Sequence, residues 1–395
     1  MSAVAQASLD IVLRERILYG AGRISELPQL VRELGAGHAF VVTDAGVERA
    51  GVAARVREVL KGGDIATHVH AEVESNPGTA SIVRGSEALG LFGTSETVVV
   101  ALGGGSSMDS AKAISLHAMN GGDVLALGYH RDGLVNGLPL IAVPTTAGTG
   151  AETNTYGVIT DEAAGRKGYV GHPSVQPRVA ILDPELTVGM PPAVTAATGV
   201  DAMTHSIESL LSRNPNPFAE AMALQVIRTV ASWLPIAVED GSHMEARGQL
   251  LLASHLAGVG QASGTGVGLV HAIGHALGTR GRLPHGTALA AVLPEVLTFY
   301  LEQEGLRDRE LALLGVSLGA ASPADPWPDA ARAGIDALDA LLRRVGQRST
   351  LAALGFDGAL VPVIALDAVD DAAIANSPRL PDEAQVEAIL RAVAA

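Results

Sequence analysis

The segment "TVVVALGGGSSMDSAK", residues 97–112, decides the fold of this chain. Its first half is a short β-branched apolar run, typical of a buried strand, and its second half has helical spacing. Three glycines at 103–105 stand between the two halves and let the backbone adopt positive φ or approach a ligand closely. We expect Ser106 or Ser107 to cap the helix, whose N–H groups would make an anion site large enough for a pyrophosphate. The spacing differs from G-x-G-x-x-G, so an ordinary strand-to-helix turn remains an alternative.

Strand-like and helix-like segments alternate on both sides of this motif. Such alternation predicts a parallel sheet covered by helices on both faces. The predicted strands are residues 38–44, 66–73, 97–105 and the start of 139–150, and the predicted helices are 51–63, 79–92 and 107–120.

The pattern becomes helical after "AILDPELTVGMPP" (180–192). Apolar residues then recur at helical spacing, and the last segment, 381–395, predicts an amphipathic helix with a proline and two acids at its start. Residues 319–331 are expected to form a Pro- and Ala-rich loop. The sequence thus predicts an α/β domain over residues 1–187 and an all-helical domain over residues 188–395.

Composition limits the function classes. The 395 residues are enough for two domains, and 48% are hydrophobic. A net charge of −15 argues against nucleic acid or an anionic membrane as partner. The chain has no cysteine, so any metal must be held by His, Asp or Glu. The N-terminus lacks the pattern of a signal peptide and no apolar run predicts a membrane span, so we expect a soluble cytoplasmic protein.

Two further segments end predicted strands with polar side chains. Asp44 closes "VVTD", where a carboxylate can accept hydrogen bonds from a ribose diol and would repel a 2′-phosphate, favouring NAD over NADP. Thr145, Thr146 and Thr149 lie in "VPTTAGTG", a loop that could line the same crevice. The alternatives are a helix N-cap for Asp44 and a tight connection for the threonine loop.

The helical half contains a possible metal-binding set. Asp201 and His205 are spaced i, i+4, as are His271 and His275, so each pair shares one helix face; His285 follows in "LPHG". One carboxylate with three imidazoles suits Fe²⁺ or Zn²⁺. Each histidine could instead be a hydrogen-bonded core residue, and the Asp/His pair could be a simple ion pair.

Together these motifs resemble the iron-containing (group III) alcohol dehydrogenase family over nearly the whole chain. The similar segments are "GGGSSMDSAK" (103–112), "PTTAGTGAE" (144–152), "ILDPELTVGMPP" (181–192), "GVDAMTHSIES" (199–209), "HAIGHALG" (271–278), "LPHG" (283–286) and "NSPRLPDEAQVEAIL" (376–390). The resemblance implies the dehydroquinate synthase-like fold, with an N-terminal dinucleotide-binding domain and a helical metal-binding domain.

The resemblance also implies roles for individual residues. Four match metal ligands, and His275 matches a catalytic histidine beside the substrate that is not a ligand. The implied ligands are Asp201, His205, His271 and His285. The implied cofactor-binding residues are Asp44, Gly103, Gly104, Gly105, Ser106, Asp109, Thr145, Thr146, Thr149 and Lys167. Asn154 and Tyr156 stand where substrate contacts would lie, in a segment that departs from the family pattern.

The implied function is hydride transfer between NAD(H) and a small alcohol, diol or functionalised aldehyde, polarised by Fe²⁺ or Zn²⁺, in a cytoplasmic homodimer. One alternative is a glycerol dehydrogenase- or dehydroquinate synthase-like enzyme, whose ligand spacing differs. Another is a metallohydrolase, although "HAIGH" lacks the glutamate that would follow the first histidine. The third is a non-catalytic nucleotide-binding protein.

Overall fold

The computed structural model describes residues 11, 15–128, 131–162, 165–303 and 305–394. It divides the chain into two compact units between Met190 and Pro191, where the sequence predicted a boundary at 187/188. The first residues of the predicted N-terminal domain, 1–10 and 12–14, lie outside the described part of the chain.

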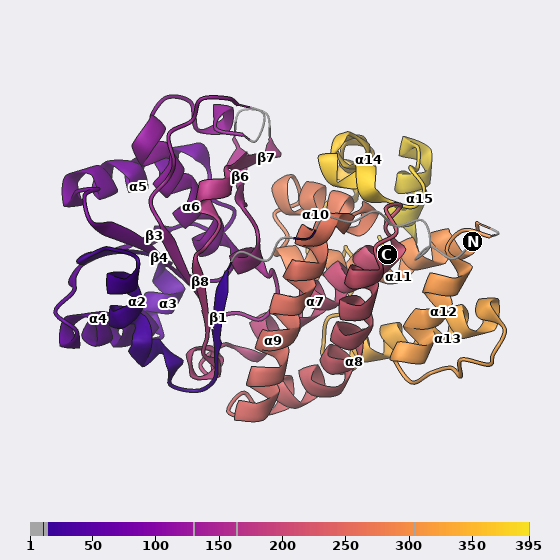
Figure 1. The fold of residues 1–395 in the computed structure, drawn as a ribbon. Helices are drawn as coiled ribbons and strands as arrows, with labels where there is room; N and C mark the ends of the chain where they lie inside the picture. Colours follow the sequence, from indigo (N-terminus) through magenta and orange to yellow (C-terminus); the bar gives the residue numbers. More distant parts are fainter. Residues whose placement is uncertain (1–10, 12–14, 129–130, 163–164, 304, 395) are drawn as a thin grey trace. The chain divides into compact units, whose positions relative to one another are not determined.

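The N-terminal unit is built on a six-stranded sheet with the order β1-β8-β5-β4-β2-β3, and every neighbouring pair is parallel (Figure 1). Its strands are β1 (Arg16–Tyr19), β2 (His38–Asp44), β3 (Ala66–Val73), β4 (Thr97–Gly103), β5 (Leu140–Pro144) and β8 (Val179–Leu182). All residues of β4 and β5 are buried, which explains why these strands are continuous apolar runs. The predicted parallel sheet is confirmed.

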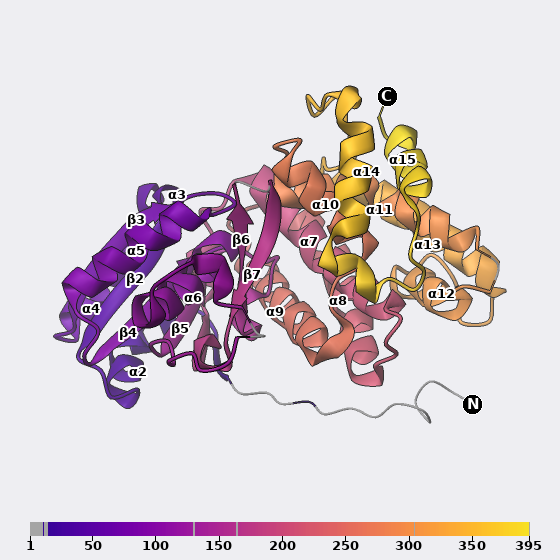
Figure 2. The same cartoon turned by 90° about the horizontal axis from the view of Figure 1, so that it is seen from above.

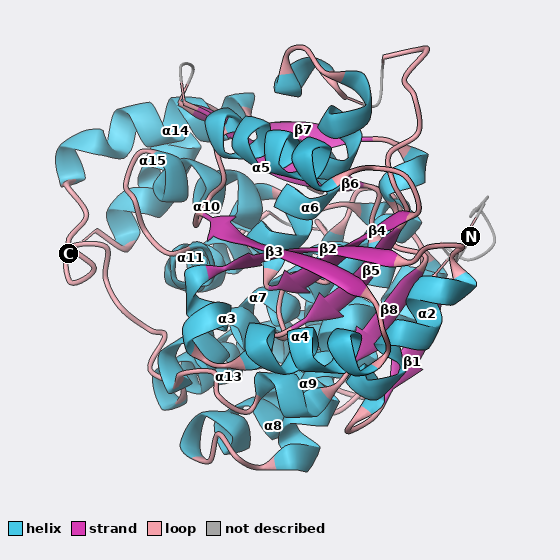
Figure 3. Ribbon diagram, turned by 90° about the vertical axis from the view of Figure 1, so that its left-hand side faces the viewer, coloured by secondary structure: helices cyan, strands magenta, loops and turns pink. Residues whose placement is uncertain are grey.

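Successive side chains of the central strands point to opposite faces, and each face has its own core. Val99 and Ala101 pack with α5 (Thr79–Phe92) and α6 (Gly105–Asn120). Val98 and Val100 pack with α2 (Leu27–Glu33) and α4 (Val52–Gly62) on the other face. Figure 3 shows the sheet between these two helical layers. The other helices in the described part of this unit are α3 (Ala45–Arg49) and the 3-10 turns η1 (Arg23–Glu26), η2 (Val124–Ala126), η3 (Ala151–Thr153), η4 (Pro173–Val175) and η5 (Pro184–Thr187).

Two features of this unit differ from the sequence prediction. The helix α6 begins at Gly105 with Gly104 as its N-cap and without a side-chain cap, so the predicted cap at Ser106 or Ser107 is wrong. The helix starts earlier because Gly103 turns the chain at a φ of 146°. An antiparallel hairpin, β6 (Tyr156–Asp161) and β7 (Arg166–Gly171), follows the threonine loop and was not predicted.

The described residues of the C-terminal unit form helices (Figure 2). They are α7 (Pro192–Leu211), α8 (Pro217–Glu239), α9 (Met244–Gly260), a π-helical turn η6 (Gln261–Thr265), α10 (Leu269–Thr279), α11 (His285–Leu301), α12 (Asp308–Ser317), α13 (Trp327–Arg344), η7 (Gly358–Leu360), α14 (Val361–Asp370), η8 (Ala372–Asn376) and α15 (Glu383–Ala392). The second half of α7 is buried throughout and packs against α8, α9 and α11. A central helix of this kind can carry polar side chains only where they have partners.

Two predictions for this unit have different outcomes. The helix predicted at the C-terminus is α15, and its N-cap Asp382 forms a capping box with Gln385. The loop predicted over 319–331 ends earlier, because α13 begins at Trp327 directly after its N-cap Pro326, where a proline is compatible with a helix start.

One helix among the described residues, α8, is long and apolar enough to cross a membrane by length and composition. It is amphipathic within this unit: residues such as Val226 and Val230 are buried, whereas Gln225 and Arg228 are exposed. It packs against α7 and α9.

Candidate functional site

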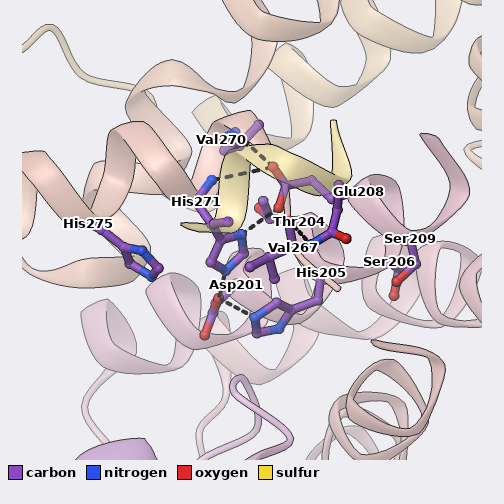
Figure 4. Close-up of polar contacts among 12 residues, drawn as sticks. Asp201, Thr204, His205, Ser206, Glu208, Ser209, Val267, Val270, His271 and His275 are labelled. Atoms are coloured by element: carbon purple, nitrogen blue, oxygen red, sulfur yellow. Dashed lines mark hydrogen bonds and ion pairs between the residues drawn. The ribbon is translucent and has the colours of Figure 1, made fainter. Parts of the chain in front are cut away.

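Three helices bring the predicted metal ligands together around one carboxylate oxygen. Asp201 and His205 lie one turn apart on α7, His271 lies in the first turn of α10, and His285 is the first residue of α11. The Nε2 atoms of His205 and His271 are each 3.5 Å from Asp201 Oδ1, and that of His285 is 3.8 Å away. Figure 4 shows Asp201 facing the rings of His205 and His271. All four predicted ligands therefore converge.

The arrangement fits a divalent cation. Asp201 Oδ1 and His271 Nε2 are buried and make no hydrogen bond among the described residues. Ligand atoms of Asp201, His271 and His285 lie within 4.8 Å of one another, close enough to share one ion. Unpaired buried polar atoms are unfavourable, and a carboxylate with imidazoles is a donor set for Fe²⁺ or Zn²⁺. His205 reaches the same carboxylate oxygen from the next turn of α7.

The charges in this cluster are strongly coupled. Burial alone would raise the pKa of Asp201, but His205, His271 and His285 hold it well below its usual range. Burial opposes the charged form of His271, yet Glu208 and Asp201 raise its pKa to about 9. Burial lowers the pKa of His285 despite the opposing effect of Asp201. A cation here would face a carboxylate that stays ionised and would compete with a proton for His271 Nε2.

Glu208 is a member of this cluster that the sequence analysis missed. Its Oε2 is 2.6 Å from His271 Nδ1, and its Oε1 accepts hydrogen bonds from the backbone N–H groups of Val270 and His271 (Figure 4). Glu208 follows Asp201 by seven residues, which is two helical turns, so it lies on the same side of α7. The seven-residue spacing in the sequence could therefore have identified Glu208 as a member of the cluster.

His275 lies beside the metal cluster but has a different partner. Its Nδ1 is 3.0 Å from Asp371 Oδ2, and its ring stacks on His285 with centroids 5.7 Å apart. Asp371 also caps η8 through a hydrogen bond from Ala373 N. Although His271 and His275 share the i, i+4 spacing of α10, only His271 faces Asp201. No sequence pattern pointed to Asp371.

The glycine turn lies in the N-terminal unit and is closely surrounded by other predicted residues. A Cβ on Gly104 would lie 3.0 Å from Thr146 Oγ1, and one on Gly105 would lie 2.7 Å from Thr149 Cγ2. Gly103 O accepts a hydrogen bond from Thr145 N. The N-cap residue Gly104 has no side chain that could accept hydrogen bonds from the first N–H groups of α6. Those N–H groups are therefore suited to bind a phosphate. Ser106 occupies the first turn of α6.

Asp44 borders the same turn. Its Oδ1 accepts hydrogen bonds from Gly46 N and Val47 N and thus caps α3, which confirms the helix-cap alternative. Its Oδ2 accepts a hydrogen bond from Ser107 Oγ and would lie 3.3 Å from a Cβ on Gly103. The cap and a ligand contact are compatible, because Asp44 is only half-buried.

The remaining predicted residues gather around a buried lysine, Lys112. Its Nζ donates hydrogen bonds to Ala151 O, Asn154 Oδ1 and Tyr156 O at 2.6–2.8 Å. Burial lowers the pKa of Lys112 to about 8, against the opposing effect of Asp109. Asn154 Oδ1 also accepts a hydrogen bond from Tyr156 N, so its amide group is oriented by this cluster.

Asp109 and Lys167 flank this lysine cluster. Burial raises the pKa of Asp109 to about 6, although Lys112 opposes the shift. Burial lowers the pKa of Lys167 to about 8, and its Nζ donates a hydrogen bond to Asn76 Oδ1 at 2.7 Å. Asp109 and Lys167 are therefore close enough to influence each other's charge. The structure thus forms two groups of predicted residues, one in each unit.

Comparisons with known proteins identify the family of this chain. The family model "Iron-containing alcohol dehydrogenase" matches residues 14–184, and "Fe-containing alcohol dehydrogenase family, C-terminal" matches residues 195–394. A probable alcohol dehydrogenase, EutG of Salmonella typhimurium, is 37% identical over 93% of this chain and 90% of its own length. Lactaldehyde reductase of Escherichia coli is 34% identical over 96% of this chain and 97% of its own.

The similarity extends to solved structures. A crystal structure of a 1,3-propanediol oxidoreductase is 31% identical, covers 98% of this chain and 100% of its own, and superposes with a TM-score of 0.92. Both halves of the chain, its sequence relatives and its fold therefore lead to one conclusion. The chain belongs to the iron-containing alcohol dehydrogenase family and is an alcohol oxidoreductase.

Proposed function

We propose that this protein interconverts small alcohols and aldehydes with NAD(H), at a centre that holds Fe²⁺ or Zn²⁺. The convergence of three imidazole Nε2 atoms on Asp201 Oδ1 carries the proposal. The substrate class is supported by the relatives, one named for lactaldehyde and one for 1,3-propanediol. We therefore expect a short alcohol, diol or hydroxy-aldehyde.

The proposed ligands are Asp201, His205, His271 and His285. A bound divalent ion would supply Lewis acidity that stabilises negative charge on the alcohol oxygen. Asp201 provides the one negative charge of this set, and the histidines provide neutral nitrogen donors. Burial of Asp201 and His271 limits competition from water for those atoms.

We propose His275 as the catalytic proton carrier. With its Nδ1 proton directed to Asp371 Oδ2, its Nε2 lone pair is available to accept a proton. Histidine suits this role because a neutral imidazole can accept a proton at one ring nitrogen while it donates a hydrogen bond from the other. Asp371 would act through His275 as a positioning residue.

The N-terminal unit would hold the cofactor. The glycines at 103–105 and Ser106 would bind the pyrophosphate at the start of α6, and Asp44 would accept hydrogen bonds from the ribose. Thr145, Thr146, Thr149, Asp109 and Lys167 would complete the surroundings of the cofactor. We propose residues 1–187 as the dinucleotide-binding domain and 188–395 as the metal and substrate domain.

Asn154 and Tyr156 remain proposed substrate contacts. Because Asn154 Oδ1 already accepts hydrogen bonds from Lys112 Nζ and Tyr156 N, its amide nitrogen is the group that would donate to a substrate oxygen. Burial raises the pKa of Tyr156 to about 12, which keeps its phenol protonated at neutral pH.

The test combines metal analysis with turnover. Protein purified without air is analysed for metal, and NADH oxidation is followed with a panel of short aldehydes. We expect one metal per chain and turnover, both lost in His285→Ala and retained in His68→Ala, an exposed histidine of β3. Bound metal without any turnover would favour a non-catalytic nucleotide-binding protein, and hydrolysis of esters or amides would favour a metallohydrolase. Activity confined to polyols such as glycerol would favour the glycerol dehydrogenase branch.

We further propose a cytoplasmic homodimer without nucleic-acid or membrane partners. The net charge of −15 supports the absence of polyanionic partners, because it would repel them. Light scattering on the purified protein tests the dimer, since a monomeric mass would contradict it.

A further inference from the structure

We propose that Glu208 is a positioning residue that fixes the tautomer of His271 and so presents His271 Nε2 to the metal. The inference rests on the proposed metal site and extends it beyond the four ligands. Glu208 is nearly buried on α7, and its carboxylate lies against the start of α10 (Figure 4).

The first part of the argument is the helix start. The N-cap of α10 is Gly268, which has no side chain to satisfy the first N–H groups of the helix. Glu208 Oε1 accepts hydrogen bonds from Val270 N at 2.7 Å and His271 N at 3.3 Å. A carboxylate from a neighbouring helix thus replaces the missing cap, at the helix end that favours negative charge.

The glycine at position 268 favours this close approach. A Cβ on Gly268 would lie 3.3 Å from Glu208 Oε1 and 3.2 Å from Ser377 Oγ, which is tighter than ordinary contact. The absence of a side chain lets Glu208 reach the backbone. The position of the carboxylate is therefore fixed by the main chain of α10.

The second part concerns the other oxygen. Glu208 Oε2 is 2.6 Å from His271 Nδ1, and an ionised carboxylate can only accept a hydrogen bond. His271 Nδ1 must therefore carry a proton. A ring protonated at Nδ1 coordinates a metal through Nε2, and Nε2 is the atom 3.5 Å from Asp201 Oδ1 that lacks a hydrogen bond among the described residues.

The variant Glu208→Gln keeps the volume of the side chain and changes only its charge and its hydrogen-bonding groups. Glutamine offers one oxygen and one NH₂ group. If its oxygen stays with the N–H groups of Val270 and His271, its NH₂ faces Nδ1 and favours the proton on Nε2, where a metal should bind. If the amide flips, the NH₂ meets two backbone donors. The first orientation disfavours the metal-ligating tautomer. The flipped orientation keeps that tautomer, because the amide oxygen still accepts from Nδ1–H, but it opposes two backbone N–H donors with another donor and so loses the cap of α10.

The experiment measures the dissociation constant of Zn²⁺ for metal-free full-length protein by competition with a chromophoric chelator. We expect Glu208→Gln to weaken Zn²⁺ binding by about 10–100-fold. Glu208→Asp keeps the carboxylate and should recover part of that affinity. The matched control is Asp382→Asn, which alters the carboxylate that caps α15 in the same unit and should leave Zn²⁺ affinity unchanged.

A spectroscopic measurement on the wild-type protein completes the test. Long-range ¹H–¹⁵N spectra of the Zn²⁺-loaded protein should show His271 protonated at Nδ1 and bound through Nε2. The opposite tautomer would overturn the inference even if no Glu208 variant folds. A lower melting temperature with unchanged Zn²⁺ affinity in Glu208→Gln would show that Glu208 only caps α10, and this result would overturn the inference. A wild-type protein that binds no Zn²⁺ would overturn the metal site itself.

Discussion

Ser107 donates a hydrogen bond from its Oγ to Asp44 Oδ2 at 3.1 Å, and this bond links the end of β2 to the first turn of α6. The second oxygen of Asp44 caps α3. Asp44 therefore has a structural role and stands beside the glycine turn at the same time. A substitution that separates the two roles can show whether Asp44 also selects the cofactor.

Asp44→Asn should change cofactor preference with little loss of stability. Asparagine can still accept the hydrogen bonds of the cap, but it lacks the charge that would repel a 2′-phosphate. We expect the ratio of the NADPH to the NADH dissociation constant, measured by fluorescence titration, to fall about tenfold. This corresponds to a change of about 1.4 kcal/mol in the relative binding free energy of the two cofactors. An unchanged ratio would contradict a cofactor role for Asp44.

Gly105→Ala should weaken NADH binding, because the added Cβ would lie 2.7 Å from the methyl group of Thr149. We expect the dissociation constant to rise about tenfold, for a strain of about 1–2 kcal/mol. Thr149→Ser removes that methyl group and should restore part of the affinity in the double variant. Gly90→Ala is the control, since a Cβ on this exposed helical glycine meets nothing within 4 Å. No rescue by Thr149→Ser would contradict the steric explanation.

Lys112→Met should destabilise the N-terminal unit. The substitution removes three hydrogen bonds and leaves Ala151 O, Asn154 Oδ1 and Tyr156 O without that donor. We expect the free energy of unfolding to fall by about 2–4 kcal/mol in urea denaturation. Lys61→Met replaces an exposed lysine of α4 and should change stability by less than about 0.5 kcal/mol. Equal effects at the two positions would show that the Lys112 contacts contribute little.

Asp109 should make stability depend on pH in mildly acidic solution. Burial raises its pKa to about 6 in the folded protein from 3.8 in the unfolded chain. Between these values the folded state binds more protons, so the contribution of Asp109 to the free energy of unfolding falls as pH rises from 4 to 6. The stability difference between wild type and Asp109→Asn should fall across that range. A difference that stays constant or rises across that range would contradict a raised pKa for Asp109.

Much of the fold could be predicted because its local patterns agree with its tertiary packing. Predicted strands 38–44 and 66–73 coincide with β2 and β3, and the predicted helix 79–92 coincides with α5. The β6–β7 hairpin was missed because Gly157 and Gly168 interrupt its apolar alternation. A Cβ on Gly157 would lie 2.5 Å from Asp109 O, so the close packing of β6 against α6 requires a glycine at this position.

The candidate site was harder to predict, because spacing places residues on a helix face without saying what that face meets. His271 and His275 are four residues apart and share one face of α10, yet His271 faces Asp201 and His275 contacts Asp371. The i, i+7 relation between Asp201 and Glu208 was visible in the sequence. Asp371 follows His275 by 96 residues, and the packing of α14 and η8 against α10 brings it near.

The central claim is that Asp201, His205, His271 and His285 hold one catalytic metal. Anomalous diffraction at the iron edge, from crystals of anaerobically reconstituted protein, tests it most directly. We predict a single iron peak within bonding distance of Asp201 and these three histidines. An iron peak elsewhere, or protein that turns over aldehyde with no metal at these residues, would contradict the account.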